Sequence, residues 1–441
     1  IWARTVKSPN PAFSHVDVPL TSTFVLSTKK GKEAYVQPVI QGDSYRFEVN
    51  VGKPDNVEEV KKGTKLGRGS NFQCLLSGTP ISGDYVKTEG KAGRIHSRMM
   101  AIVAEGDRGR VYLAPKPDHE KIVNHANPEW RPKGNVPARL TGGTCVPYGL
   151  ANWADLYTHR QLVALTTFSD LVQESREKVI SDAKKAGWMD DGVGLENGGL
   201  STTAYGDAVA VYLAFAVDRM AMTGNNLVRW NSVGEKAQHC FGRQALPMLW
   251  DFAEVNFMGN ATGSMKAAIF FSYDPLNWMR PMNRGECLQL NATEQSFSNF
   301  KVVSTDPPYY DNIGYADLSD FFYVWLRKSL INIIPYILNT ITTPKNDELV
   351  ATPYRHTNKD KAEQFFLDGM TQAMEGLAKQ AHGGYPTTIY YAFKQSESKT
   401  DVGIYNTGWE TFLEALADAG FGITGTWPMR TEMKTRQISM G

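Results

Sequence analysis

One stretch, residues 301–311, constrains the fold of this chain more than any other. Its first five residues, Lys-Val-Val-Ser-Thr, are rich in β-branched side chains and predict a buried strand. The strand stops at Asp306, because Pro307 and Pro308 have no backbone N–H for a sheet and keep Asp306 extended. The sequence therefore predicts a stiff loop at the carboxyl end of a strand, which is the edge where open α/β sheets bind ligands.

The loop Asp306-Pro307-Pro308-Tyr309 suits chemistry on an aromatic amine. The lone pair of such an NH2 group is delocalised into its ring, so the nitrogen is a poor nucleophile. The Asp306 carboxylate and the Pro307 carbonyl can both accept hydrogen bonds from the NH2, which frees the lone pair for attack on a sulfonium methyl donor. Pro308 holds the loop, and Tyr309 offers a face for stacking a flipped base, worth about 1–3 kcal/mol. The alternative is a strand-terminating turn with a core tyrosine.

Length and charge set further bounds. A chain of 441 residues with 42% hydrophobic residues is long enough for two or three domains. The formal net charge is +1, but residues 1–133 carry 21 Lys and Arg against 14 Asp and Glu, giving +7. The rest carries 26 against 32, giving −6. The basic first section predicts contact with phosphates, with a merely solvated surface as the alternative.

The cysteine pattern and the hydropathy favour a reduced, cytoplasmic setting without a membrane partner. No signal peptide is visible, and the most apolar run, residues 330–341, is too short to cross a bilayer. The four cysteines lack disulfide-motif or metal-ligand spacing: Cys74, Cys145, Cys240 and Cys287.

The periodicity divides the chain into three sections. Residues 1–133 read as β-rich, residues 134–284 as helical, and residues 285–441 as alternating strands and helices of a doubly wound, mostly parallel sheet. The predicted strands are 22–27, 34–40, 45–51, 99–104, 110–114, 286–290, 301–305, 387–393 and 422–427. The predicted helices are 162–185, 205–222, 314–326, 361–379 and 409–419.

Two turns in the first section have the form of zinc-ribbon knuckles, Ser8-Pro-Asn-Pro-Ala-Phe13 and Cys74-Leu-Leu-Ser77. Cysteines at residues 8, 13 and 77 would complete C-x4-C and C-x2-C, the ligand spacing of structural zinc. As the sequence stands, only Cys74 supplies a thiolate. We therefore predict a degenerate ribbon that holds no metal.

Three other features carry candidate roles. Residues 241–254 place Arg243, Gln244, Trp250 and Asp251 in a pocket lining or on an amphipathic helix, and the sequence leaves both open. The aromatic face of 314–326 is predicted to be core, and the acidic residues near its start suit a helix N-terminus. Asn291 follows a predicted strand, a position suited to contacting an adenine ring.

The run from Thr305 to Arg327 resembles the catalytic motif of adenine-specific DNA methylases that carry a zinc-ribbon insertion. The resemblance covers nearly the whole chain and is also carried by residues 89–93, 241–248, 351–356, 390–395 and 425–432. It implies a partial Rossmann-like methyltransferase sheet and S-adenosylmethionine as cofactor. It further implies methyl transfer to adenine N6 in double-stranded DNA, in a restriction-modification or phage-defence system with protein partners.

The predicted site residues fall into three groups. The catalytic residues are Asp306, Pro307, Pro308 and Tyr309. The cofactor-binding residues are Asn291, Ala292 and Thr305. The substrate-binding residues are Tyr310, Tyr315, Arg243 and Gln244.

The chain departs from the family pattern in two respects. The ribbon cysteines are mostly replaced, and no glycine-rich cofactor loop is visible. In the family that loop precedes the point matching Ile1, and a final strand is expected beyond Gly441. We therefore expect an internal piece of a longer polypeptide, which by itself binds S-adenosylmethionine weakly.

Two alternatives remain open. The same loop can serve cytosine N4, or an amine in RNA or protein. The chain can also be a non-catalytic, DNA-binding subunit of a larger assembly, with the basic first section as its binding surface; DNA binding would then be salt-sensitive.

Overall fold

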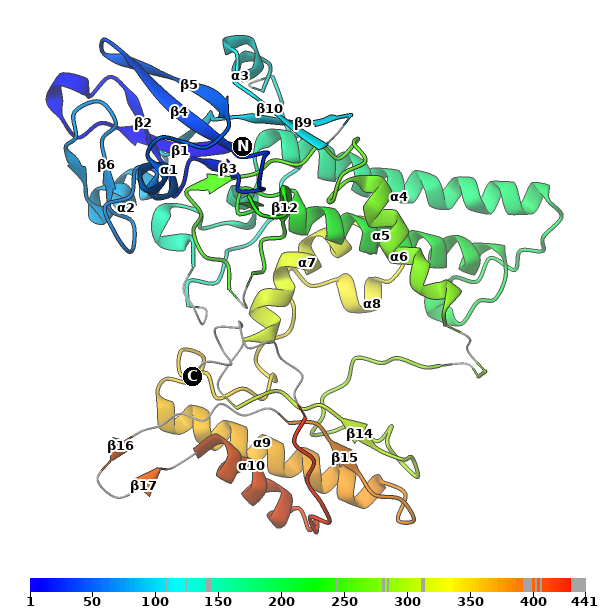
Figure 1. Ribbon diagram of the computed structural model, residues 1–441. Coiled ribbons are helices and arrows are strands. Elements are labelled where there is room, and N and C mark those ends of the chain that lie inside the picture. Colours follow the sequence, from blue (N-terminus) through cyan, green and yellow to red (C-terminus); the bar gives the residue numbers. More distant parts are fainter. Residues whose placement is uncertain are drawn as a thin grey trace. The chain divides into compact units, whose positions relative to one another are not determined.

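The computed structural model describes residues 1–107, 109–123, 125–139, 144–242, 245–279, 282–283, 285–310, 314–391, 399–400, 403–404 and 407–429. The chain forms two compact units (Figure 1). The first unit comprises Ile1–Ala138, Gly143–Pro281 and Asp320–Thr342. The second comprises Met282–Ser319 and Thr343–Gly441, together with Arg139–Gly142. The division of the chain into three sections stays a prediction.

The strand β1 (Trp2–Lys7) organises the largest sheet of the first unit. It pairs antiparallel with β2 (Asp17–Leu20), β8 (His96–Met99) and β13 (Asp251–Phe252). Five of its six residues are buried, so the strand is covered on both faces. The pairing of β13 with β1 joins segments about 250 positions apart, which no local pattern of the sequence indicates.

A second sheet shows the alternation that the sequence predicts. Its middle strand β4 (Ala34–Gln41) pairs antiparallel with β3 (Val25–Ser27) and β5 (Ser44–Val51). Val36 is buried and Gln37 beside it is exposed, because successive side chains of a strand point to opposite faces. The further strands of this unit are β6 (Phe72–Gln73), β7 (Pro80–Ile81), β9 (Ile102–Gly106), β10 (Gly109–Leu113), β11 (Arg229–Asn231) and β12 (Lys236–Gln238).

The helices of the first unit include the two long ones that the sequence predicts, α4 (His159–Lys185) and α5 (Thr202–Thr223). The start of α4 is fixed by a capping box, in which Thr158 and Gln161 exchange side-chain to backbone hydrogen bonds. α4 and α5 lie side by side, and α6 (Met265–Tyr273) packs against α5 (Figure 1). The short helices are α1 (Val57–Lys62), α2 (Gly83–Lys91), α3 (Pro117–Val123), α8 (Pro335–Leu338), η1 (Pro11–Phe13), η2 (Val146–Tyr148), η3 (Trp153–Leu156), η4 (Leu195–Asn197) and η5 (Asp274–Asn277).

The helix α7 (Tyr315–Leu330) confirms the prediction that its aromatic face is core, except for its first residue, Tyr315, which is exposed. Phe321 and Trp325 are fully buried in the main hydrophobic cluster of the first unit. The Phe321 ring lies within 6.3 Å of the rings of Trp153 and Tyr157, centroid to centroid. These aromatic contacts anchor the carboxyl-terminal part of α7.

The second unit contains a parallel strand pair whose connection along the chain includes several helices. β14 (Ser304–Thr305) pairs with β15 (Thr388–Ile389), and the connection between them includes α9 (Lys359–Gln380). The helix α10 (Thr407–Asp418) packs on α9 around Phe366 and Phe412, both fully or almost fully buried. Two more strands, β16 (Lys399–Thr400) and β17 (Gly403–Ile404), pair antiparallel.

Several strand predictions for the second unit are wrong in extent or in existence. The predicted strand 301–305 is reduced to two residues, as is the described part of 387–393, which ends at residue 391, and 286–290 and 422–427 are not strands. The expected burial of 301–305 is also wrong, since Val302 is 62% exposed. The physical reason is that a strand persists only where neighbours pair its N–H and C=O groups. Among the described residues, β14 has a partner on one side, β15.

The amphipathic helix considered for 241–254 is also absent in the described residues. Trp250 is buried between the rings of Phe72 and Tyr148, at 5.1 and 5.0 Å, and β13 follows directly. Asp251 accepts a hydrogen bond from the Ser22 N–H at 2.6 Å, and burial raises the pKa of its carboxyl. Residues 251 and 252 thus form strand β13 and pair with β1, where the sequence had also allowed a helix.

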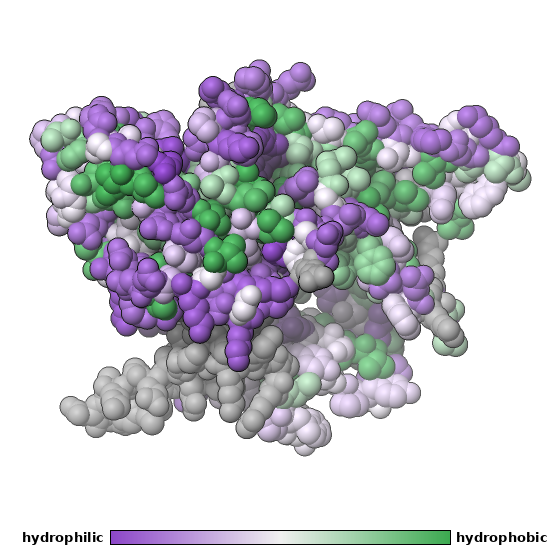
Figure 2. Space-filling view, turned by 45° about the horizontal axis from the view of Figure 1, so that its top comes forward, coloured by the Kyte–Doolittle hydropathy of each residue, from purple (hydrophilic) through white to green (hydrophobic). Residues whose placement is uncertain are grey.

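The fold is mixed α/β, with small and mostly antiparallel sheets. Within the described ranges, no helix combines the length and apolar character needed to cross a membrane. On the face drawn in Figure 2, hydrophilic residues surround separate hydrophobic patches.

Candidate functional site

The Asp306 loop begins where β14 ends. Thr305 pairs with Ile389 of β15, and its carbonyl accepts a hydrogen bond from the Tyr390 N–H at 2.8 Å. The next residue, Asp306, is exposed, whereas Pro307 is buried. The parallel pair therefore holds the loop at the carboxyl end of a strand.

The loop carries two hydrogen-bond acceptors at neighbouring residues, the Asp306 carboxylate and the Pro307 carbonyl. In the part of the chain that the structure describes, no group donates a hydrogen bond to the Asp306 carboxylate or to the Pro307 carbonyl. Neither Pro307 nor Pro308 has an N–H, so this part of the loop offers acceptors without competing backbone donors. Such an arrangement can take both hydrogens of one NH2 group.

Tyr309 lies among aromatic rings. Its half-buried ring meets the ring of Tyr315 edge-on at 6.4 Å and the ring of Tyr391 edge-on at 6.0 Å. Tyr391 in turn stacks face to face on Phe412 of α10 at 3.9 Å. These contacts fix the orientation of the Tyr309 ring, because edge-to-face contacts are directional.

Tyr315, the first residue of α7, is tied to the same loop. Burial raises the pKa of its hydroxyl to about 12, and the negative charge of Asp306 contributes to this shift. The Tyr315 ring also meets the Tyr309 ring edge-on. Tyr315 therefore stays protonated at neutral pH and lies close to the predicted catalytic residues.

Tyr310 has a structural setting. Its ring packs edge-on against Phe366 of α9 at 5.1 Å, and its carbonyl accepts a hydrogen bond from the Ala351 N–H at 2.7 Å. Both contacts fix the loop to the core of the second unit. The predicted substrate contact by Tyr310 stays a prediction.

The predicted cofactor residues are not assembled as the sequence suggests. Asn291 does not follow a strand, and its side-chain oxygen accepts hydrogen bonds from the N–H and the hydroxyl of Thr293, at 3.0 and 2.9 Å. Ala292 beside it is exposed in the same turn, and Thr305 ends β14. The predicted substrate residues Arg243 and Gln244 lie outside the described residues.

The two knuckle-like turns do come together in the first unit. The Ser8 Oγ and Cys74 Sγ atoms lie 3.3 Å apart, and Cys74 is buried. Burial by itself raises the pKa of the Cys74 thiol, but hydrogen bonds from Ser77 and Ser8 outweigh it and lower the pKa. Hydroxyls thus contact the sulfur where a ribbon would have further thiolates. Among the described residues, no group of three His, Cys, Asp or Glu side chains is placed to hold a metal.

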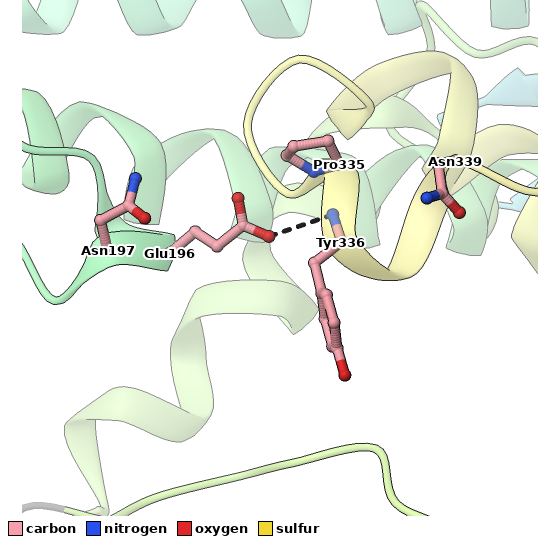
Figure 3. A pocket seen from close by; sticks show the side chains of 5 residues that line it. All are labelled: Glu196, Asn197, Pro335, Tyr336 and Asn339. Atoms are coloured by element: carbon pink, nitrogen blue, oxygen red, sulfur yellow. Dashed lines mark hydrogen bonds between the residues drawn. The ribbon is translucent and has the colours of Figure 1, made fainter.

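A surface hollow of about 600 Å³ lies in the first unit (Figure 3). Its lining residues are Glu196, Asn197, Pro335, Tyr336 and Asn339. Glu196 accepts a hydrogen bond from the Tyr336 N–H at 3.1 Å, and the Tyr336 ring is 71% exposed. The charged group of this lining thus already caps α8, which makes the Asp306 loop the better candidate site.

Sequence analysis missed one group of residues beside this loop. Arg355 forms ion pairs with Asp317 and Glu348, and Tyr354 donates a hydrogen bond to Asp317. Asp317 was expected only to suit a helix N-terminus. Residues 351–356 were noted only for their resemblance to the methylase family, because nothing in the sequence pairs Arg355 with acids 7 and 38 positions away.

Comparison with protein-family models, with curated proteins and with solved structures gave no match.

Proposed function

We propose that this chain provides the amine-activating site of a DNA methyltransferase acting on adenine N6. The observation that carries the proposal is the exposed Asp306, which directly follows the carboxyl end of β14 and precedes the two prolines of the loop. Open α/β sheets place their ligands at this edge.

Each residue of the loop would have a separate role in the reaction. The Asp306 carboxylate and the Pro307 carbonyl would each accept one hydrogen of the adenine NH2, which localises the nitrogen lone pair. Charged acceptors form the stronger hydrogen bonds, so Asp306 contributes more than Pro307. Pro308 would keep the two acceptors at a fixed separation, and Tyr309 would stack the base after it leaves the duplex.

The parallel pair supports a finer description of the fold. β14 and β15 pair in parallel, α10 packs beside α9, and the chain between the two strands runs through α7, α8 and α9 as a helical connection of a βαβ kind. This is the repeating element of a doubly wound sheet. We therefore propose that the second unit is the catalytic half of a Rossmann-like methyltransferase sheet.

S-adenosylmethionine is the proposed methyl donor, and bound at this edge it would supply the methyl group. Of the residues predicted to touch it, Thr305 lies next to Asp306, whereas Asn291 uses its side-chain oxygen within its own turn. The described residues do not build a complete pocket for this cofactor. The proposal accordingly rests on the amine-binding side of the reaction.

A second candidate function is a DNA-binding subunit without catalysis. The observation that favours it is the +7 charge of residues 1–133, which suits a phosphate backbone. This function predicts DNA binding that weakens steeply with salt and is indifferent to residue 306. Cytosine N4 is the alternative acceptor if the chain is an enzyme.

The experiment measures methyl transfer from labelled S-adenosylmethionine to double-stranded DNA by the full-length protein. Asp306→Ala removes the charged acceptor, and Asp418→Ala, at the exposed end of α10, is the matched control. We expect the wild type and Asp418→Ala to transfer methyl at the same rate, and Asp306→Ala to be slower by about 100-fold or more. Equal rates for Asp306→Ala and wild type would refute the proposal. Mass spectrometry of digested nucleosides distinguishes N6-methyladenine from N4-methylcytosine.

A further inference from the structure

Three charged side chains meet in the interior of the second unit. The Arg355 guanidinium lies between two carboxylates, with Nη2 2.8 Å from Asp317 Oδ2 and Nη1 2.5 Å from Glu348 Oε2. The three side chains are only 12%, 6% and 14% exposed. Water therefore screens this ion-pair group weakly, and its members depend on one another for compensation of charge.

The group fixes the first turn of α7. Glu348 uses its second oxygen, Oε1, to accept a hydrogen bond from the Ala316 N–H at 2.9 Å, so it caps the helix. The Thr343 hydroxyl donates to the Ala316 carbonyl at 2.8 Å. Asp317 belongs to the same turn. The segment 343–356 thus holds both backbone groups of the residue that follows Tyr315.

The same segment holds the Asp306 loop from two directions. The Ala351 N–H donates to the Tyr310 carbonyl at 2.7 Å, and the Tyr315 ring packs edge-on against the Tyr309 ring at 6.4 Å. The end of the loop is also packed against the ion pair. A Cβ atom on Gly314 would lie 2.8 Å from Asp317 Oδ2 and 3.1 Å from Arg355 Nη2, closer than ordinary contact.

We propose that Arg355, with Asp317 and Glu348, is a positioning residue that sets the geometry of the Asp306 loop. This inference rests on the proposed methyl transfer, and it assigns Arg355 no contact with substrate. Arg355 neutralises the two acids, the acids fix the first turn of α7, and Tyr315 of that turn fixes Tyr309. An arginine suits this task because its planar guanidinium addresses two carboxylates at once, which a lysine ammonium does less well.

The experiment compares Arg355→Lys and Gly314→Ala with wild type and with the surface control Lys379→Ala. Lys379 is exposed and pairs within α9 with Glu375. We expect Arg355→Lys and Gly314→Ala to lower kcat by about 100-fold, the loss that a misplacement of about 1 Å causes, while KM for DNA changes less than about threefold. Lys379→Ala should match wild type in both constants. A kcat within about threefold of wild type for both Arg355→Lys and Gly314→Ala would overturn the inference.

Hydrogen exchange gives a readout independent of catalysis. The amides of Ala316 and Ala351 should exchange at least about 10-fold faster in Arg355→Lys than in wild type, while amides of β4 and β5 in the first unit stay unchanged. Unchanged exchange at both amides would refute the positioning role. If Asp306→Ala methylates DNA as fast as wild type, the proposed function fails, and the exchange measurement still decides whether Arg355 holds the loop.

Discussion

The buried pair of Tyr157 and Trp325 allows a prediction about stability. The effect of Tyr157→Phe on the free energy of unfolding should depend on whether Trp325 is present. Trp325 Nε1–H donates a hydrogen bond to the Tyr157 hydroxyl at 2.9 Å, and both residues lie in the main core of the first unit. Burial raises the pKa of the Tyr157 hydroxyl well above its usual value, so the hydroxyl is neutral in the folded protein. The pair anchors α7, the helix that begins at Tyr315.

The size of the change in the free energy of unfolding follows from the polar groups that each substitution leaves without a hydrogen-bond partner. Tyr157→Phe removes the acceptor and leaves the indole N–H buried and unsatisfied, which costs about 1–3 kcal/mol. In a Trp325→Phe background the Tyr157 hydroxyl has already lost this donor. The same Tyr157→Phe change then removes a buried polar group, and it should be neutral or slightly stabilising.

The assay is urea unfolding of the four members of the double-mutant cycle, followed by far-ultraviolet circular dichroism at 25 °C. The free energy of unfolding should fall by about 1–3 kcal/mol for Tyr157→Phe in the wild-type background. It should fall by about 0 kcal/mol, or rise, in the Trp325→Phe background. Equal losses in the two backgrounds would show that the hydrogen bond does not couple these residues and would refute the reasoning.

Two further predictions concern the first unit. Asp218 of α5 is buried, and burial raises the pKa of its carboxyl well above 3.8, so the folded state keeps a proton that the unfolded state releases as the pH rises. Asp218→Asn should therefore raise Tm, and by more at pH 8 than at pH 5; an equal change at both pH values in thermal unfolding contradicts this. At the ribbon-like turns, a chelator should leave Tm unchanged, whereas Cys74→Ala should lower the free energy of unfolding by about 1–2 kcal/mol through lost packing and sulfur hydrogen bonds. Stoichiometric zinc in the purified protein would contradict the chelator prediction.

At the candidate site, the sequence predicts where the strand ends but not how long or how buried the strand is. The proline pair at 307 and 308 predicts that a strand ends at Asp306, and the structure places Asp306 directly after β14. The prolines act within two or three residues, so their effect needs no knowledge of the rest of the chain. The predicted length and burial of that strand were wrong, because they depend on neighbouring strands.

The ribbon-like turns show what residue spacing can indicate. Ser8, Cys74 and Ser77 were singled out by spacing alone, and the structure brings them together through hydrogen bonds to the Cys74 sulfur. Their contact in space was found only in the structure. The absence of further thiolates among these residues underlies the prediction that no metal is bound, which remains a prediction.

Local physical chemistry in the sequence by itself indicated a helix over residues 162–185, the alternation of β4 and β5, and the position of the Asp306 loop. Helical periodicity, alternating side chains and prolines each act over a few residues, so they can be recognised without a fold. Only the tertiary structure decided that β13 pairs with β1, and that Arg355 joins Asp317 from 38 positions away. The edge of a strand or a charged side chain can pair with many different groups. Only the packing of the whole folded chain brings one of these groups within reach, so such partners cannot be recognised from the local sequence.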